Sequence, residues 1–296
     1  MKTIQNIIIT ISLLLMSSTT YGQLNPMGSI YFQNQYAANP AMAGIQEGWV
    51  INGAYKVQWT AIDGAPSMQT LTATYGLPDR KLGFGLNFYN ENAGVIRRNS
   101  VKGTYAYHIP LNDNRSFLDF GISSNIISEW IDFNKVVGDP EDQSLHQFNI
   151  RPLYVEGDFG ISYRNERLTV QGSLSNIKRL LTTDLTRNVI DRSLYMGAVS
   201  YTFFYQSGII SSIEPKIMYR GVENYKDLID LGAQVQCYND KLMLSAIYHS
   251  TNAVTFGAGT FYQNKLRILC LYTSGTSDLR KYSNGEFEIA LQYQFK

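Results

Sequence analysis

Few residues in this sequence have the types and spacing that metal or covalent chemistry requires. The three histidines, His108, His146 and His249, lie far apart and form no His-x-His or His-Glu-x-x-His pair. The two cysteines, Cys237 and Cys270, are also widely separated. Because protein metal sites need several such ligands at short intervals, the sequence predicts no metal site.

Three other short motifs could suggest catalysis or ligand binding, and each lacks a requirement. His249 and Ser250 could serve as base and nucleophile, but neighbouring residues in a strand point to opposite faces. The acidic run at 139–142 lacks the alternating ligands and turn glycine of a calcium loop, so we interpret it as a solvated loop. Gly83 and Gly85 lie in a predicted strand with no helix after it, which excludes a nucleotide-binding loop. We therefore expect a non-enzymatic protein without a cofactor.

The elements that carry these residues are strands, and the C-terminal segment shows this most clearly. Its polar or small even positions from Glu286 to Lys296 alternate with five apolar odd positions, Phe287, Ile289, Leu291, Tyr293 and Phe295. Only a strand with one apolar and one polar face satisfies this period of two. The same alternation recurs at 82–89, 118–126 and 229–236. A membrane β-barrel has lipid on one face of each strand and water on the other, although a soluble β-sandwich would also alternate.

The length of the first predicted strand favours the membrane barrel. Trp49 and Trp59 lie on the same predicted face, and the ten residue steps between them climb about 25 Å at a rise of roughly 3.3 Å and a tilt of roughly 40°. That height matches the apolar band of an outer-membrane barrel, so we expect the two tryptophans near the two lipid interfaces. The alternative is that both are core residues of a soluble sheet.

The whole pattern predicts an all-β fold, a transmembrane antiparallel β-barrel of about 14 strands over residues 48–296. The predicted strands are 48–60, 66–77, 81–90, 97–109, 116–130, 153–164, 167–176, 192–205, 208–220, 228–238, 241–249, 253–262, 265–273 and 285–295. Every second connection is short and rich in turn-forming residues, as periplasmic turns are. The longer connections, notably 131–152, 177–191 and 274–284, are predicted to be extracellular loops.

The N-terminus predicts the compartment. Residues 1–22 combine a lysine, an apolar run from Ile7 to Met16 and small residues up to Gly22, which indicates a secretory signal peptide. That run is too short to span a bilayer, and no other stretch approaches the roughly 20 apolar residues of a transmembrane helix. An exported protein of this kind is expected in the cell outer membrane as a multi-pass barrel, with residues 23–47 as an N-terminal periplasmic segment.

Charge and cysteine content add two expectations. The 25 basic and 24 acidic residues give a net charge of +1 and are interspersed, so no nucleic-acid partner is expected. The barrel itself predicts outer-membrane lipid as a partner. Cys237 and Cys270 fall in separate predicted strands at positions predicted to face lipid, where a disulfide is not expected.

The segment before the first strand carries a family resemblance. It contains the motif Asn39-Pro40-Ala41-Met42-Ala43-Gly44, and Lys56-Val57-Gln58-Trp59 follows in the first strand. Together with the length, signal peptide and aromatic-ended last strand, these motifs resemble the PorP/SprF family of outer-membrane barrels, which are associated with type IX secretion and gliding motility in Bacteroidetes. Lys56 stands where many members have Arg, so a bidentate carboxylate contact is not expected there.

The residues of the motif predict a rigid turn. Pro40 fixes its own φ and biases Asn39 toward an extended conformation, while Gly44 permits a turn. We expect this elbow to pack at the periplasmic mouth and to hydrogen-bond to the inner face of the first strand, where Asn52, Lys56 and Gln58 point. Two interpretations stay open, a purely structural N-terminal cap and a partner-docking element that includes Asn39, Pro40, Ala41, Ala43, Gly44, Lys56, Gln58 and Trp59.

The resemblance implies a function of interaction rather than catalysis. It implies a barrel that assists the secretion or surface anchoring of large proteins with type B C-terminal signal domains. The implied partners are type IX components in the periplasm and outer membrane, and such a secreted surface protein. The alternative is a passive or FadL-like small-molecule channel, because about fourteen strands can enclose a lumen.

Overall fold

The structure contains strands in all of the regions where the sequence predicts them. The computed structural model describes residues 29–61, 64–79, 81–111, 115–136, 148–149, 153–178, 194–206, 208–222, 227–263, 265–275 and 284–295. The strands within these ranges are β1 Gly48–Gln58, β2 Ser67–Gly76, β3 Leu82–Ala93, β4 Ile96–Leu111, β5 Ser116–Ile131, β6 Tyr154–Asn165, β7 Leu168–Ser175, β8 Leu194–Tyr201, β9 Phe203–Phe204, β10 Ile210–Val222, β11 Leu228–Cys237, β12 Leu242–His249, β13 Ala253–Tyr262, β14 Leu266–Thr273 and β15 Glu286–Gln294.

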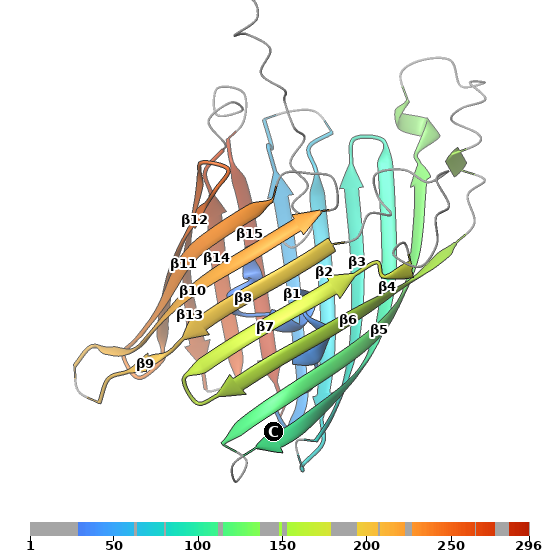
Figure 1. The fold of residues 1–296 in the computed structure, drawn as a ribbon. Coiled ribbons are helices and arrows are strands. Elements are labelled where there is room, and N and C mark those ends of the chain that lie inside the picture. The colour runs from blue at the N-terminus through green and yellow to red at the C-terminus, as the bar shows by residue number, and fades with distance from the viewer. Residues whose placement is uncertain are drawn as a thin grey trace, which may run out of the picture.

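These strands form a closed antiparallel barrel, as predicted (Figure 1). Consecutive strands pair with each other, and β15 pairs with β1 to close the wall. The predicted strand at 192–205 is interrupted at Thr202, so β8 and β9 together count as one of 14 strands. Closure gives every strand two neighbours, which removes the unpaired edges that a lipid environment does not tolerate.

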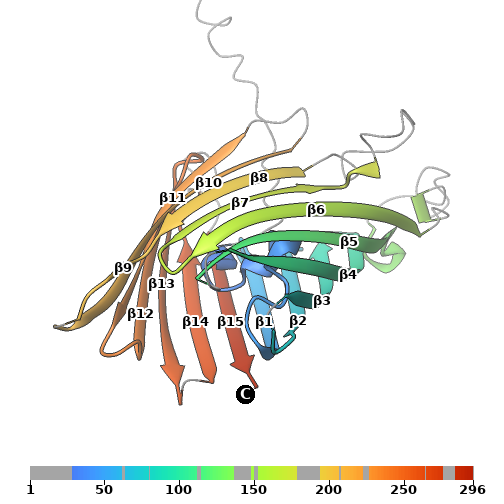
Figure 2. The same ribbon diagram turned by 60° about the horizontal axis from the view of Figure 1, so that its bottom comes forward.

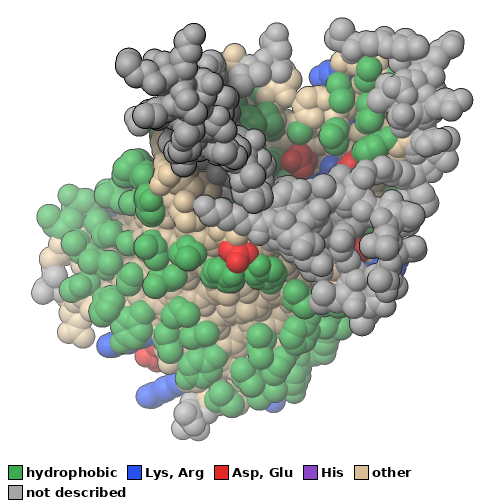
Figure 3. Space-filling view, turned by 45° about the horizontal axis from the view of Figure 1, so that its top comes forward, with side chains coloured by type: hydrophobic (Ala, Val, Ile, Leu, Met, Phe, Trp, Pro, Cys, Tyr) green, Lys and Arg blue, Asp and Glu red, His purple; other side chains and the backbone are tan. Residues whose placement is uncertain are grey.

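Side chains divide between the two faces of the wall as the alternation predicts. Leu86, Ile122, Leu231 and Leu291 are all at least 46% exposed on the outside. Figure 3 shows hydrophobic side chains spread over the outer surface. The inward positions are mostly small or polar and are buried. The register of the last strand is therefore the predicted one.

The end of the first strand differs from the expectation. The first strand ends at Gln58, and Trp59 adopts a left-handed φ of 53°. Trp59 therefore lies outside the strand and does not continue the face that carries Trp49. Its N–H donates to Gly285 O instead. Both cysteines are free. Cys270 is exposed, whereas Cys237 is buried although its pairing with Leu242 places it on the outer face, with Leu244.

Besides the strands, the structure contains short 3-10 turns. They are η1 Ile30–Phe32, η2 Gln35–Ala37, η3 Pro40–Met42 and η4 Phe133–Lys135. Within the described ranges, no helix has the length and apolar character that crossing a membrane requires. The first three turns lie inside the barrel, where Figure 2 shows them in blue behind the strands.

Candidate functional site

The residues before β1 occupy the barrel lumen. We call Ser29 to Gly44 the lumenal segment; it comprises η1, η2 and η3 and the residues between them. Nearly all of its residues are buried, and Asn39, Ala41 and Ala43 have no exposed surface. The segment runs from the long-loop end of the barrel, where Ser29 lies, toward the short-turn end, where Gly44 packs beside the β2–β3 turn region. The lumen is therefore filled by the chain's own N-terminal residues.

Local sequence rules explain the elbow, which we define as Asn39 to Gly44. Asn39 is extended (φ −143°, ψ 116°) and its Oδ1 accepts a 2.9 Å hydrogen bond from Ala41 N, so it caps η3. Pro40 follows at the first position of η3, where its missing N–H costs nothing. Gly44 has a φ of +67°, which a residue with a side chain adopts only with strain. The motif is thus a cap, a turn and a chain reversal.

Glycines of the wall make room for the elbow backbone. We call Gly83 of β3, Gly121 of β5 and Gly160 of β6 the glycine seat. A Cβ on Gly83 would lie 2.0 Å from Ala43 O, and one on Gly160 would lie 2.0 Å from Asn39 Oδ1. One on Gly121 would lie 2.3 Å from Pro40 C. Because real Cβ atoms do not approach so closely, only glycine allows the elbow to rest against these three strands.

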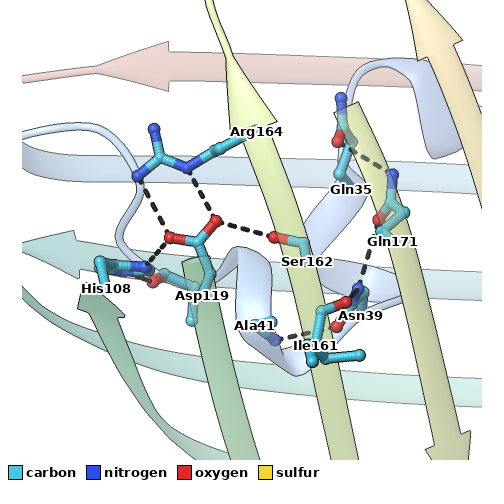
Figure 4. A network of polar contacts seen from close by, with 10 residues as sticks. Gln35, Asn39, Ala41, His108, Asp119, Ile161, Ser162, Arg164 and Gln171 are labelled. Atoms are coloured by element: carbon cyan, nitrogen blue, oxygen red, sulfur yellow. Dashed lines mark hydrogen bonds and ion pairs between the residues drawn. The ribbon is translucent and has the colours of Figure 1, made fainter. Parts of the chain in front are cut away.

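Side-chain hydrogen bonds fix the elbow to β6 and β7 (Figure 4). Asn39 Nδ2 donates to Ile161 O at 3.2 Å and to Gln171 Oε1 at 3.4 Å. Gln171 Nε2 in turn donates to Gln35 Oε1 at 3.2 Å. Ser173 Oγ donates to Ala38 O at 2.8 Å. Asn39 therefore stabilises the turn within the segment and its attachment to the wall.

A charged cluster contacts the end of the elbow. We call His108, Asp119, Ser162 and Arg164 the His108 cluster, and Figure 4 shows it beside η3. His108 Nδ1 lies 2.7 Å from Asp119 Oδ1, and His108 Nε2 lies 3.0 Å from Ala43 O. Asp119 Oδ2 also accepts hydrogen bonds from Ser162 Oγ at 2.7 Å and Arg164 Nε at 3.0 Å. His108 and Asp119 have no exposed surface, so this contact is shielded from water.

A similar cluster lies at the other end of the segment. Arg220 and His249 both contact Asp230 at 2.7 Å, and His249 Nε2 lies 2.7 Å from Thr255 Oγ1. We call these four residues the His249 cluster. Thr255 Oγ1 lies 3.3 Å from Ser29 Oγ. Both histidines thus belong to buried groups that reach the lumenal segment, one at each end.

Between its ends, the segment matches a lumen with an apolar side and a polar side. Ile30 packs with Met243, Leu269, Leu271 and Ala290, and Tyr31 and Phe32 pack with Met196, Ala198, Met218 and Ile247. On the polar side, Asn34 Nδ2 donates to Thr72 Oγ1 at 3.0 Å, and Tyr36 OH contacts Thr104 Oγ1 at 2.8 Å. Burial raises the pKa of Tyr36 to about 12, so its hydroxyl is neutral.

The structure places the eight predicted site residues in two separate groups. Asn39, Pro40, Ala41, Ala43 and Gly44 lie together in the elbow, against β3 to β7. The expectation that the elbow bonds to the inner face of the first strand is not what the structure shows. The elbow lies deeper, inside the lumen, and its partners come from other strands.

The second group lies at the long-loop end of β1. Lys56 and Gln58 share the inner face with Asn52, as predicted. They contact Glu286 of β15 at 2.6 Å and 2.7 Å rather than the elbow. The Lys56 contact is a one-point ion pair, in keeping with the expectation for lysine at this position.

Two sets of functional candidates were missed from the sequence, the glycine seat and the two histidine clusters. The signal for the clusters is hairpin register, because cross-strand partners lie equally far from a short turn. His108 and Asp119 face each other across one turn, and Asp230 and His249 across another. Among the described residues, no group of three or more metal-ligating side chains could hold a metal ion. His146 and the acidic run at 139–142 lie outside the described residues.

Comparison with known proteins identifies the family. The family model described as "Type IX secretion system membrane protein PorP/SprF" matches residues 21–293, which is nearly the whole chain. The chain belongs to the PorP/SprF family. No curated protein matches the chain. As a member of this family with a closed barrel, it is an outer-membrane protein.

Solved structures that resemble this PorP/SprF barrel are outer-membrane barrels with little sequence similarity. The CymD monoaromatic hydrocarbon channel has a TM-score of 0.51 and 10% identity, with 88% of this chain and 92% of that chain covered. A FadL homologue from Pseudomonas aeruginosa has a TM-score of 0.49 and 11% identity, with 93% and 96% covered. Omp33 from Acinetobacter baumannii has a TM-score of 0.49 and 8% identity, with 85% and 100% covered. At these identities the likeness shows the fold alone.

Proposed function

We propose that this PorP/SprF protein is a non-enzymatic accessory or anchoring subunit of the type IX secretion and gliding machinery. It would assist the secretion or surface anchoring of large proteins with type B C-terminal signals. The observation that carries the proposal is the lumenal segment, which fills the barrel with the chain's own residues and leaves the family motif fully buried. A barrel closed in this way is better suited to binding partners than to free passage of solutes.

The elbow connects the motif to this function. In its buried position Asn39 to Gly44 cannot contact another protein, so its direct role is to close the lumen, which agrees with the structural-cap interpretation. We propose that a periplasmic or outer-membrane component engages the elbow when it leaves the glycine seat. Residues 1–22 act as the signal peptide in this proposal, and the short-turn end of the barrel faces the periplasm.

A double substitution in the elbow tests the proposal. A side chain at Gly44 would lie 2.5 Å from Gly83 Cα and from Tyr75 O, and Gly44 also needs its positive φ. Pro40→Ala loosens the turn and Gly44→Val obstructs its positive φ, so the double variant should lose the preorganised elbow that the partner would engage, while the strand ladder stays paired. Gln46→Ala is the matched control, since Gln46 is exposed and lies just outside the elbow.

The readout is crosslinked affinity purification from the native membrane, followed by mass spectrometry. The wild type and Gln46→Ala should recover type IX components or a large surface protein, and the double variant should lose them while it still assembles as a barrel. Assembly with every partner retained would remove the elbow from partner binding. A wild-type barrel that recovers no secretion component at all would contradict the proposed function.

The second candidate is a small-molecule channel, and the apolar side of the lumen favours it. Met196, Met218 and Met243 line the wall there, and methionine surfaces adapt to varied apolar ligands. The lumenal segment covers that part of the wall with Ile30, Tyr31 and Phe32, so a channel would require the segment to move. Uptake of a hydrophobic solute by proteoliposomes that hold the purified wild type would support this candidate.

A further inference from the structure

The hydrogen bonds around His108 require one proton more than a neutral histidine supplies. Its Nε2 faces Ala43 O, and its Nδ1 faces a carboxylate oxygen of Asp119. A carbonyl and a carboxylate only accept hydrogen bonds, so both ring nitrogens must donate, and a neutral imidazole carries a single N–H. A proton on Asp119 instead of His108 gives the same total, so the count belongs to the pair and not to one residue.

The surroundings of His108 contain few other charges. Asp119 faces it from β5 and Arg164 from β6, where Ser162 also donates to the carboxylate. Gly83 of β3 lies beside the ring and has no side chain, and the elbow presents only the Ala43 carbonyl. The contact with Lys81 is through its backbone carbonyl, which accepts from His108 N. Ser162 and Arg164 both donate to Asp119, so a carboxylate that only accepts satisfies all of its neighbours and the second proton of the pair belongs on the imidazole.

Loss of that proton acts directly on the elbow. The single N–H of a neutral His108 is held by the negatively charged carboxylate of Asp119, because a charged acceptor makes a stronger hydrogen bond than a carbonyl does, so Ala43 O then faces the lone pair of His108 Nε2 at 3.0 Å. A hydrogen bond becomes a repulsive contact in a buried site. We propose that release of the elbow from the glycine seat is coupled to loss of one proton from the His108 cluster. The lumenal segment is thus closed by a proton-dependent contact at its short-turn end.

His249 provides a built-in contrast. Its Nδ1 also faces a carboxylate, that of Asp230, but its Nε2 faces the hydroxyl of Thr255. A hydroxyl can donate or accept, so a neutral His249 satisfies both partners without an extra proton. The two clusters are alike in composition, but only in the His108 cluster do two obligate acceptors require the second proton.

The sign of the coupling follows from the proton count. The seated form binds one proton more than the released form, so raising the pH favours release. With one proton exchanged, the ratio of released to seated molecules rises at most tenfold for each pH unit. Tyr36, with a pKa of about 12, stays neutral in the range of about pH 5 to about pH 8 in which an unperturbed histidine changes its charge.

Hydrogen exchange of the backbone amides in 39–44 measures release in the full-length protein in detergent micelles. His108→Gln keeps a donor at this position but does not titrate, and comparing it with the wild type at each pH cancels the intrinsic pH dependence of exchange. We expect the ratio of wild-type to His108→Gln exchange to rise with pH, by up to tenfold per pH unit. His249→Gln should follow the wild type. A flat ratio, or an equal loss of pH dependence in His249→Gln, would overturn the proposal.

Nuclear magnetic resonance of the wild type with labelled histidines covers the case in which His108→Gln fails to assemble. Only three histidines contribute, and His146→Gln and His249→Gln assign their signals. At neutral pH the His108 signals should be those of a ring with both nitrogens protonated. A neutral His108 ring in the barrel with the segment seated would contradict the proposal.

Discussion

At the scale of single residues, the smallest side chains decide how the lumen is filled. Ala41 and Ala43 have no exposed surface, and the wall residues opposite the elbow are glycines. A dense contact of backbone against backbone results, and it has no space for even one added methyl group. The family motif is therefore explained by packing against a particular part of the wall, in addition to its own turn geometry.

Gly160→Ala tests this contact. The new Cβ would lie 2.0 Å from Asn39 Oδ1 and 2.9 Å from Ala41 N, so the elbow must shift, at a cost of about 1–3 kcal/mol. Gly103→Ala is the matched control, because its Cβ meets no atom within 4 Å. Thermal unfolding in detergent should show a lower midpoint for Gly160→Ala alone. Equal midpoints for the two variants would show that the elbow does not rest on β6 in solution.

At the scale of elements, each strand sorts its side chains between lipid and lumen. In β15, Leu291 points outward and is 47% exposed, while its neighbour Gln292 lies on the inner face opposite Arg267 of β14. A register shift of one residue would exchange these two faces for the whole strand. The two positions therefore report directly on the orientation of the last strand.

Leu291→Arg should impair assembly, because a charge near the middle of the lipid face costs about 2–4 kcal/mol. Gln292→Glu introduces a charge one residue away, on the lumen side beside Arg267, and should be tolerated. The fraction of protein that reaches the membrane as a compact barrel, measured on unheated gels, checks both. The opposite order of assembly yields would show that the strand faces are reversed.

At the scale of the whole molecule, the lumenal segment and the wall form one packed unit. The apolar side of the lumen receives Ile30, Tyr31 and Phe32, and the polar side receives the amide side chains of Asn34 and Asn39. Two charged clusters contact the segment near its ends. The barrel is thus stabilised by its strand ladder and by a filled interior, and both contributions should be lost together on unfolding.

The mature protein should begin at Gln23 and should migrate faster on gels when it is not heated, because a closed ladder resists detergent. Mass spectrometry of the N-terminal peptide from outer-membrane fractions checks the first expectation, and paired heated and unheated samples check the second. A mature protein that retains residues 1–22, or that migrates identically in both samples, would contradict these expectations.

The sequence by itself determined the strands, their faces and the closed barrel, because the information for each is local. Alternation with a period of two is legible within one strand, as between Phe287 and Phe295, and short turns set the register of each hairpin. The turn geometry of Asn39, Pro40 and Gly44 was also predictable, since each residue restricts or frees its own backbone. Trp59 was misplaced because its own left-handed backbone conformation ends the strand at Gln58, and alternation does not reveal such a conformation.

Only the tertiary structure decided where the elbow lies and what it contacts. Ala43 meets His108 across 65 positions in the chain, and Asn39 meets Gln171 across 132. Such contacts depend on how a closed wall surrounds the segment, and no local pattern carries that information. For the same reason the sequence did not reveal that Lys56 and Gln58, which were expected to contact the elbow, contact β15 instead. The glycine seat is the clearest case, since a glycine in a strand shows its purpose only when another backbone is packed against it.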